Sequence, residues 1–269
     1  MVARVNGSFA TSGVPGTRFA EVRWVAETGS TNRDLLAAAA EGAPEGLVLV
    51  ADYQSAGRGR LDRAWIAPAG ASLLVSALLR PSVAPEDLFL LTLACGLAAV
   101  DAVEEVAGVK PGLKWPNDLV VTEGLLIDRK LAGILAESHV VDGRVDAVVV
   151  GMGLNLDWPD DLPAELAATA ASVNHLTGRP VDREEVLVAW LRHYDRHLDA
   201  IASAGTREDF LAEVRSASST IGRDVRVENP TETFEGRAVG IADDGRLLVD
   251  RAGEVVAVTV GDIVHAKLI

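Results

Sequence analysis

Residues 57–65 read Gly57-Arg58-Gly59-Arg60-Leu61-Asp62-Arg63-Ala64-Trp65, and an apolar run of strand length lies on each side, at residues 47–53 and 72–79. This order predicts a loop between two strands, and the loop carries three guanidinium groups and an indole. Glycine lets backbone N–H groups approach a ligand, arginine binds carboxylate or phosphate oxygens, and tryptophan stacks on flat rings. The loop therefore suits an anionic ligand that carries an aromatic base.

The composition places this cationic loop in an acidic protein. The chain has 269 residues, of which 49% are hydrophobic and 24% charged, as expected of a globular protein. Acidic residues outnumber basic ones by 39 to 25, and the net charge is −14. This balance opposes bulk binding to nucleic acid or to an anionic membrane, so the predicted partners include neither. The arginines of the loop need a local explanation.

A single cysteine, Cys95, lies in an apolar run, which predicts a core residue rather than a nucleophile. One cysteine allows no disulfide within the chain and fits a reducing compartment. Residues 1–16 lack the apolar segment of a signal peptide, so we expect a cytoplasmic protein. The apolar stretch at residues 88–100 is shorter than the ~20 residues of a membrane span and predicts a buried helix.

Apolar periodicity predicts a mixed α/β protein. Strands are expected at residues 18–26, 47–53, 72–79, 118–122, 130–137 and 145–154, and helices at residues 31–41, with Thr31 as the cap, 88–108 and 183–202. Beyond residue 222 the pattern becomes short strands and turns, at residues 225–227, 234–241, 246–249 and 255–260. We therefore expect a flexible segment at 1–17, a main domain at 18–217 and a small β-domain at 218–269.

Three further segments carry polar groups at expected element ends. Ser30-Thr31-Asn32 begins a helix, where short polar side chains and the helix N-terminus favour a polar or anionic ligand; an ordinary N-cap is the alternative. Gln54 ends a strand, where side chains meet ligands. Lys114-Trp115-Pro116-Asn117-Asp118 combines a cation, an indole, an amide and a carboxylate between two strands, although such a sequence also forms plain turns.

Two glycine-bearing strands complete the set. Lys130 leads into an apolar strand in which Gly133 allows a close approach, and a surface lysine is the alternative. Gly151-Met152-Gly153 follows a strand but lacks the third glycine and the helix of a dinucleotide fingerprint, so we reject a Rossmann site and interpret Asn155 as a nucleotide contact or a turn residue. His193 and His197 are spaced to meet one metal ion, but we interpret them as a surface pair on an exposed helix face.

The succession of these motifs along residues 27–156 resembles the biotin protein ligase family. The resemblance implies an α/β core with a mixed sheet like that of class II aminoacyl-tRNA synthetases, followed by a small SH3-like β-barrel. It implies that biotin reacts with ATP, with Mg²⁺ present, to give biotinyl-5′-AMP and pyrophosphate. The biotinyl group then passes to a lysine of a biotin carboxyl carrier protein domain.

The resemblance also implies roles for individual residues. Lys130, Arg60 and Asp118 are the expected catalytic residues, with Asp118 orienting or deprotonating the incoming lysine. The expected biotin contacts are Ser30, Thr31, Asn32, Gln54, Gly57, Arg58, Gly59, Arg60, Lys130 and Gly133. The expected ATP or adenylate contacts are Arg58, Arg60, Arg63, Trp65, Lys114, Asn117, Lys130 and Asn155. No metal ligands are assigned.

Some members of this family carry an N-terminal winged helix and act as repressors. Here about 26 residues precede the first ligand motif, so we expect a ligase without DNA binding, as a monomer or weak homodimer. A lipoate or octanoate ligase of the related fold is the alternative enzyme, and a nucleic-acid-binding module is the alternative from another class. Two departures stand out, because Leu61-Asp62 replaces the Arg-Gly of many relatives and residues 121–127 form a longer hairpin tip.

Overall fold

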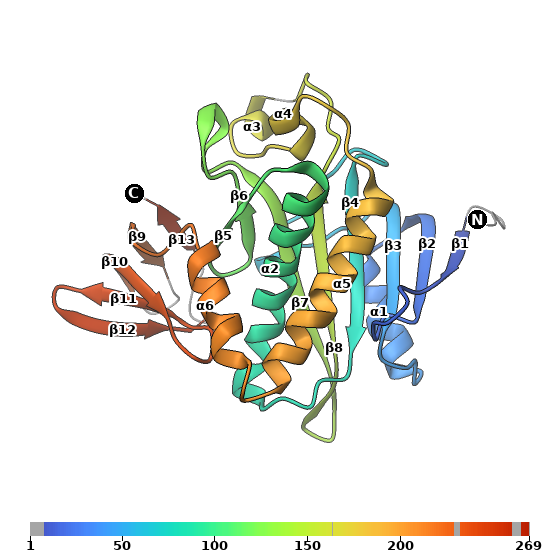
Figure 1. The fold of residues 1–269 in the computed structure, drawn as a ribbon, viewed down its shortest axis with the longest axis horizontal. Helices are drawn as coiled ribbons and strands as arrows, with labels where there is room; N and C mark the ends of the chain where they lie inside the picture. Colours follow the sequence, from blue (N-terminus) through green and yellow to red (C-terminus); the bar gives the residue numbers. More distant parts are fainter. Residues whose placement is uncertain (1–7, 163, 229–231, 260–264, 269) are drawn as a thin grey trace.

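The structure is a computed structural model that describes residues 8–162, 164–228, 232–259 and 265–268. Figure 1 shows a large sheet with helices on both faces and a second, smaller sheet near the C-terminus. The large sheet has the strand order β1-β2-β3-β4-β8-β7-β6-β5, and the small one has the order β12-β11-β10-β9-β13. Among the described residues, no helix has the length and apolar character needed to span a membrane.

The first ten elements build the large sheet and two of its helices. They are β1 (Ser8–Ser12), β2 (Glu21–Thr28), α1 (Thr31–Ala40), β3 (Leu47–Gln54), β4 (Ser72–Leu79), α2 (Leu88–Ala107), β5 (Gly112–Lys114), β6 (Asp118–Val120), β7 (Lys130–Val141) and β8 (Arg144–Asn155). The remaining elements are α3 (Ala164–Ala167), α4 (Val173–Thr177), α5 (Arg183–Ala202), α6 (Arg207–Ala217), β9 (Asp224–Glu228), β10 (Thr233–Ile241), β11 (Leu247–Arg251), β12 (Glu254–Val258) and β13 (His265–Leu268).

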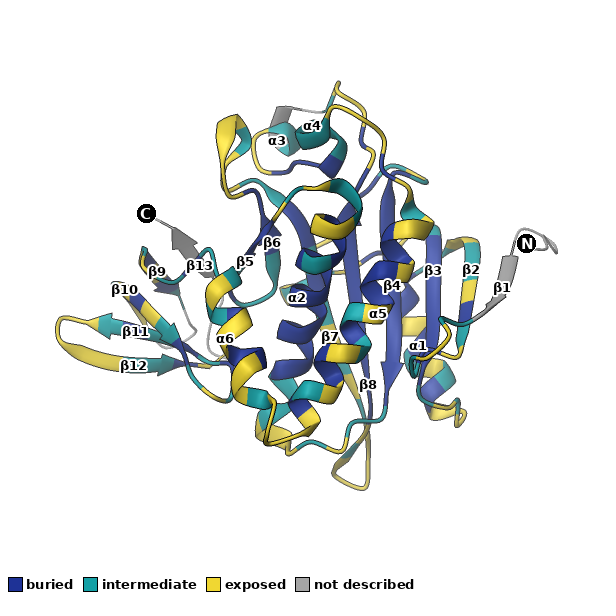
Figure 2. Cartoon of the chain, in the orientation of Figure 1, coloured by how far each residue is buried: buried dark blue, intermediate teal, exposed yellow. Residues whose placement is uncertain are grey.

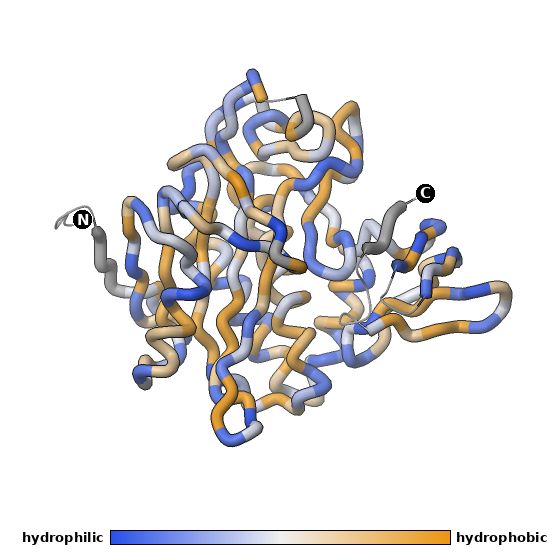
Figure 3. The backbone as a smooth tube through the Cα atoms, turned by 180° about the vertical axis from the view of Figure 1, so that it is seen from behind, coloured by the Kyte–Doolittle hydropathy of each residue, from blue (hydrophilic) through white to orange (hydrophobic). Residues whose placement is uncertain are grey.

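The large sheet is antiparallel except where β2 pairs with β3, and α1 makes the crossover between these two parallel strands. Helices α2 and α5 cover one face and α1 lies on the other (Figure 1). All eight residues of β4 are buried, because this central strand has helices on both sides (Figure 2). A strand that is buried on both faces has apolar residues at every position instead of at alternate ones. This explains the continuous apolar run at residues 72–79 that predicted β4. Seen from behind, hydrophobic segments follow the central strands (Figure 3).

The predicted fold class is confirmed, and the structure adds elements that the sequence patterns did not predict. These are β1, β5, α3, α4, α6 and β13. Strand β1 lies in the segment expected to be flexible and pairs with β2 over residues 8–12, while residues 1–7 lie outside the described part. The prediction that Thr31 caps α1 was also wrong. Ser30 occupies the N-cap position, and it makes no side-chain capping hydrogen bond. The Thr31 side chain faces a different partner, described below.

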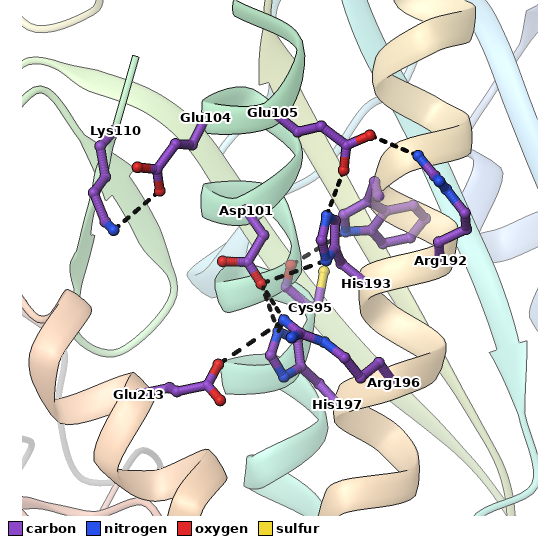
Figure 4. Close-up of polar contacts among 11 residues, drawn as sticks. Cys95, Asp101, Glu104, Glu105, Lys110, Arg192, His193, Arg196, His197 and Glu213 are labelled. Carbon is purple, nitrogen blue, oxygen red and sulfur yellow. Dashed lines mark hydrogen bonds and ion pairs between the residues drawn. The ribbon is translucent and has the colours of Figure 1, made fainter. Parts of the chain in front are cut away.

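A charged cluster, named here the α2–α5 cluster, joins the two long helices (Figure 4). The Asp101 carboxylate lies 2.8 Å from His197 Nε2 and 2.9 Å from Arg196 Nη2. His193 binds Glu105 at 2.8 Å on the same pair of helices. The prediction of an exposed histidine pair was wrong for His197, whose side chain is only 2% exposed. His197 lies at helical spacing from the other buried residues of α5, so it belongs to the core face of that helix. The Asp101 carboxylate on α2 provides a hydrogen-bond partner for its ring nitrogen.

Candidate functional site

A cavity of about 370 Å³ lies where the 57–65 loop, the start of α1 and the ends of the central strands meet. Strand register explains part of this meeting, because Lys114 pairs with Asp118, Asp118 with Gly133, and Gly133 with Gly153. Four positions far apart in sequence thus form one row across β5, β6, β7 and β8. The residues expected to bind a ligand and found in the lining are Ser30, Thr31, Asn32, Gln54, Arg58, Gly59, Arg60, Arg63, Trp65, Lys114, Asn117, Asp118, Lys130, Gly133 and Asn155.

Gly57 is the one residue of the predicted set outside this lining. Its carbonyl accepts a hydrogen bond from the Trp65 backbone N–H at 2.9 Å, and its position leaves no room for a side chain, since a Cβ would lie 2.8 Å from the Trp65 carbonyl oxygen. Gly57 therefore forms the base of the loop. Arg58 pairs with Ala64 in the same narrow hairpin, and Leu61 at its tip has φ +57. This left-handed conformation disfavours a branched side chain such as leucine.

Glycines in β7 and β8 form the floor beneath the indole of Trp65. A Cβ on Gly153 would lie 2.4 Å from this ring, and one on Gly133 would lie 2.8 Å from it. Gly153 therefore has a different role from the glycines of a dinucleotide-binding fingerprint. It lies in an antiparallel strand and makes space for the Trp65 ring. Trp65 Nε1 is buried without a hydrogen-bond partner, as is Asn155 Oδ1 in the same lining. Such orphaned polar atoms at a cavity indicate ligand contacts.

The cavity has an excess of positive charge. Arg58, Arg60, Arg63, Lys114 and Lys130 line it, and among its described lining residues Asp118 supplies the carboxylate. Lys130 Nζ lies 2.7 Å from Asp118 Oδ1 and 5.3 Å from the centre of the Trp65 ring. Burial lowers the pKa of the Arg60 guanidinium, although the negative charge of Asp118 opposes this effect. Arg60 stays charged, because its ordinary pKa is far above neutrality.

A chain of short polar contacts lies at the start of α1. The Thr31 backbone N–H donates to Gln54 Oε1 at 2.8 Å, and Thr31 Oγ1 lies 3.0 Å from the same oxygen. Ser76 Oγ, on the buried strand β4, lies 2.7 Å from Thr31 Oγ1 and 2.6 Å from Asn32 Oδ1. Asn32 Nδ2 donates to the Glu137 carboxylate at 2.8 Å. Thr31 thus contacts strand residues instead of capping its helix.

Sequence reasoning missed one wall of the cavity, which is formed by residue 158 and by residues 166–170. Trp158, Leu166, Thr169 and Ala170 line it there. The Lys130 backbone N–H donates to the Thr169 carbonyl at 2.9 Å, so this segment also holds Lys130 in place. The indole of Trp158, close after the Asn155 motif, was the available signal. Ser76 was missed because a serine inside an apolar strand gives no pattern.

Cys95 plays no part in the site. It is fully buried in α2, and burial raises the pKa of its thiol, so the thiolate needed for nucleophilic attack is disfavoured. The prediction of a core cysteine is confirmed.

Comparisons with known proteins match the part of the chain that carries most of the cavity-lining motifs, and also the C-terminal sheet. Residues 25–155 match the Biotin/lipoate A/B protein ligase family, and residues 220–266 match the Biotin protein ligase C terminal domain. A biotin--[acetyl-CoA-carboxylase] ligase of Mycobacterium tuberculosis is 40% identical over 258 residues, covering 94% of this chain and 91% of that protein. The bifunctional ligase/repressor BirA of Bacillus subtilis is 35% identical over 223 residues, covering 82% of this chain and 66% of that protein.

A solved structure also resembles this fold. The biotin protein ligase from Aquifex aeolicus in complex with biotin and ATP superimposes with a TM-score of 0.79 at 28% sequence identity. The match covers 92% of this chain and 98% of that one.

Proposed function

The chain belongs to the biotin protein ligase family, and we propose that it biotinylates a lysine of a biotin carboxyl carrier protein domain in two steps. The first step joins biotin and ATP as biotinyl-5′-AMP with release of pyrophosphate. The second step transfers the biotinyl group to the lysine. One observation carries the proposal: a single cavity combines a hydrogen-bonding chain at one side with five cationic side chains and a glycine floor.

Biotin would lie with its cyclic urea at the start of α1. Thr31 and Gln54 present polar atoms there, and the small side chain of Ser30 is 4% exposed beside them. The carboxylate at the other end of the ligand would point toward Lys130, which lies across the sheet on β7. This orientation places the reacting end of biotin in the cationic part of the cavity. Trp65 would offer its ring to the adenine once the loop closes over both ligands.

The first step brings two anions together, because the biotin carboxylate oxygen attacks the α-phosphorus of ATP. A new O–P bond forms, the bond to the β-phosphate oxygen breaks, and pyrophosphate leaves with the electron pair. Lys130 and Arg60 would neutralise the charge that accumulates on the phosphoryl oxygens. Lys130 is already held toward this region by Asp118 at 2.7 Å. A preset cation needs little reorganisation during the reaction.

In the second step the acceptor amine attacks the acyl carbon, and AMP leaves with the electron pair of the C–O bond. The amine loses a proton, and Asp118, the carboxylate among the described lining residues, can orient it or take that proton. Closure of the 57–65 loop would exclude water from the mixed anhydride meanwhile. No nucleophile of the enzyme takes part.

Mg²⁺ is expected to enter with the phosphates of ATP. This ion favours phosphate and water oxygens with one or two carboxylates, and the described lining supplies Asp118 together with the amide of Asn117. These two side chains would hold it, and it would supply further positive charge at the phosphates. The donor set therefore suits a substrate-borne ion better than a resident one.

Transfer of labelled biotin to a purified carrier protein domain tests the proposal. We expect label on the acceptor lysine with ATP present and none without it. Pyrophosphate release with lipoate or octanoate in place of biotin tests the alternative enzyme of the related fold. Release with lipoate but not with biotin would overturn the biotin assignment, and salt-sensitive nucleic-acid binding without ATP turnover would overturn both.

A further inference from the structure

The polar chain at the start of α1 has a defined direction, and both of its ends are fixed. At one end, the side-chain nitrogen of Asn32 faces two acceptors, the Leu135 carbonyl at 3.1 Å and the Glu137 carboxylate at 2.8 Å. The amide oxygen must therefore face Ser76. At the other end, Gln54 accepts the Thr31 backbone N–H at 2.8 Å, so its amide oxygen must face Thr31.

Between these fixed ends lie three oxygen–oxygen contacts but only two hydroxyl protons. The contacts are Asn32 Oδ1 to Ser76 Oγ at 2.6 Å, Ser76 Oγ to Thr31 Oγ1 at 2.7 Å, and Thr31 Oγ1 to Gln54 Oε1 at 3.0 Å. Serine and threonine each supply one proton, and a carboxamide oxygen supplies none. One contact is left without a hydrogen. The two shortest contacts are those that need a proton most, since bare oxygens repel each other at such separations.

The direction of the chain follows from this count together with the contact lengths. Asn32 Oδ1 can only accept, so the Ser76 proton is committed to it. The Thr31 hydroxyl can donate to Gln54 Oε1 at 3.0 Å or to Ser76 Oγ at 2.7 Å, and the shorter contact assigns its proton to Ser76. Ser76 is 0% exposed, so water does not compete for its hydroxyl, whereas Thr31, which is 3% exposed, reaches the cavity. The contact left without a hydrogen is the one between Thr31 Oγ1 and Gln54 Oε1, and both residues line the cavity.

We propose that Ser76 is a positioning residue that turns the Thr31 hydroxyl into an acceptor, so that the pocket selects a ligand with a ring N–H. The inference rests on the proposed function, because the cyclic urea of biotin offers such an N–H to the Thr31–Gln54 oxygen pair. The dithiolane ring of lipoate has no N–H and would leave two acceptors facing each other. Glu137 acts on the same chain from its partly exposed end by fixing the Asn32 amide.

A glycine in β8 makes room for this arrangement. A Cβ on Gly151 would lie 2.0 Å from Asn32 Oδ1 and 2.9 Å from Ser76 Oγ. Any side chain at this position would separate the two oxygens and release the Ser76 proton. The first glycine of the Gly151-Met152-Gly153 motif thus serves the urea side of the cavity, and the second serves the Trp65 side.

The test compares biotin with two carbamate analogues, in each of which one ring N–H is replaced by oxygen, by calorimetric titration of the native protein and its Ser76→Ala variant. We expect one analogue to bind the native protein about tenfold more weakly than biotin, as loss of one buried hydrogen bond typically costs. In Ser76→Ala the Thr31 proton can turn to Gln54, so biotin binding weakens and the preference over that analogue disappears.

Two further variants separate positioning from a general structural effect. In a Thr31→Val background, Ser76→Ala should change the biotin-to-carbamate ratio no further, because Ser76 acts through Thr31. Ser72→Ala removes another fully buried hydroxyl of β4, which accepts from Trp158 Nε1, and should keep the native ratio. If Ser76→Ala does not fold, Glu137→Met examines the chain from its other end and should lower the ratio.

The outcomes distinguish this inference from the proposed function. A native ratio retained in Ser76→Ala or in Glu137→Met, with biotin still bound, overturns the positioning role alone. Failure of the native protein to bind biotin overturns the proposed function and this inference with it. Equal binding of biotin and both carbamates by the native protein shows that no ring N–H is read, and also overturns the inference.

Discussion

The cavity beside the 57–65 loop and the α2–α5 cluster both contain arginines, acidic residues and buried polar atoms, yet their charges are matched differently. In the α2–α5 cluster, Asp101 faces His197 and Arg196, and Glu105 faces Arg192 and His193 (Figure 4). In the cavity, five cationic side chains line the walls with Asp118 as the carboxylate among the described lining residues. A cluster that neutralises itself holds helices together, whereas unmatched charge and orphaned polar atoms indicate a place for a ligand.

The same comparison decides against a metal ion in the α2–α5 cluster. Ligand atoms of Asp101, His197 and Glu213 lie within 4.8 Å of one another. However, the Arg196 guanidinium lies 2.9 Å from Asp101 Oδ2 and 3.9 Å from Glu213 Oε2. This guanidinium supplies the positive charge that a metal ion would otherwise bring.

The largest expected effect comes from removing the central cation of the cavity. Lys130→Ala should lose at least about 2 kcal/mol of transition-state stabilisation, as removal of a single charged group typically does, and pyrophosphate release should slow accordingly. The readout is single-turnover release with saturating biotin and ATP. Lys110→Ala is the matched control, because Lys110 is an exposed lysine paired with Glu104 at 3.0 Å, and it should react at the native rate. A native rate for Lys130→Ala would show that the cavity's charge is not used in the first step.

A smaller effect is expected at Arg60, which contacts Asn117 across the cavity at 3.5 Å. Arg60→Gly should release several-fold more free biotinyl-adenylate per transfer, because the loop no longer holds the intermediate by its charge. Chromatography of labelled adenylate measures this leakage. Arg23→Gly removes an exposed arginine that pairs with Glu21 and should leak no more than the parent. If Arg60→Gly releases no more biotinyl-adenylate than the parent protein, groups other than Arg60 retain the intermediate.

In the α2–α5 cluster the expected losses are in stability rather than in activity. Asp101→Asn should lower the free energy of unfolding by about 1–3 kcal/mol, since it leaves the buried His197 without its charged partner. Denaturant titration measures this, and the rate per folded molecule should stay native. Glu104→Gln, in an exposed pair on the same helix, should cost less than about 1 kcal/mol. An Asp101 variant with native stability but altered catalysis would reverse the assignment of the two regions.

Acid sensitivity sharpens the same contrast. Burial raises the pKa of Asp101, but the hydrogen bond from His197 and the neighbouring cations outweigh it, so its pKa lies below the ordinary value. A carboxylate with a lower pKa in the folded than in the unfolded chain stabilises the fold above its unfolded pKa. That contribution is lost as the pH falls through the folded value, below roughly pH 4. The stability gap between the native protein and Asp101→Asn should therefore close on acidification.

Local signals in the sequence predicted much of this molecule, because apolar runs and glycine-rich ligand motifs follow from short-range rules. The buried strand β4 and the long helix α2 are examples, since two-sided burial leaves an unbroken apolar pattern. The short strand β5 and the helix α3 carry too few residues to show periodicity. Ser76 and Glu137 gave no signal, because their importance lies in contacts with Asn32 from 44 and 105 residues away.

The smallest expected effect concerns motion of the loop rather than rate or stability. Leu61 holds φ +57 at its tip, a conformation that costs a residue other than glycine about 1–2 kcal/mol, so the ligand-free loop should open readily. Hydrogen exchange across residues 57–65 should slow when biotin and ATP are added together. Residues 192–198 of α5 serve as the internal reference and should exchange at the same rate with and without ligands. Slowing in both segments would indicate global stabilisation by ligand, and unchanged exchange in the loop would rule out its closure over the adenylate.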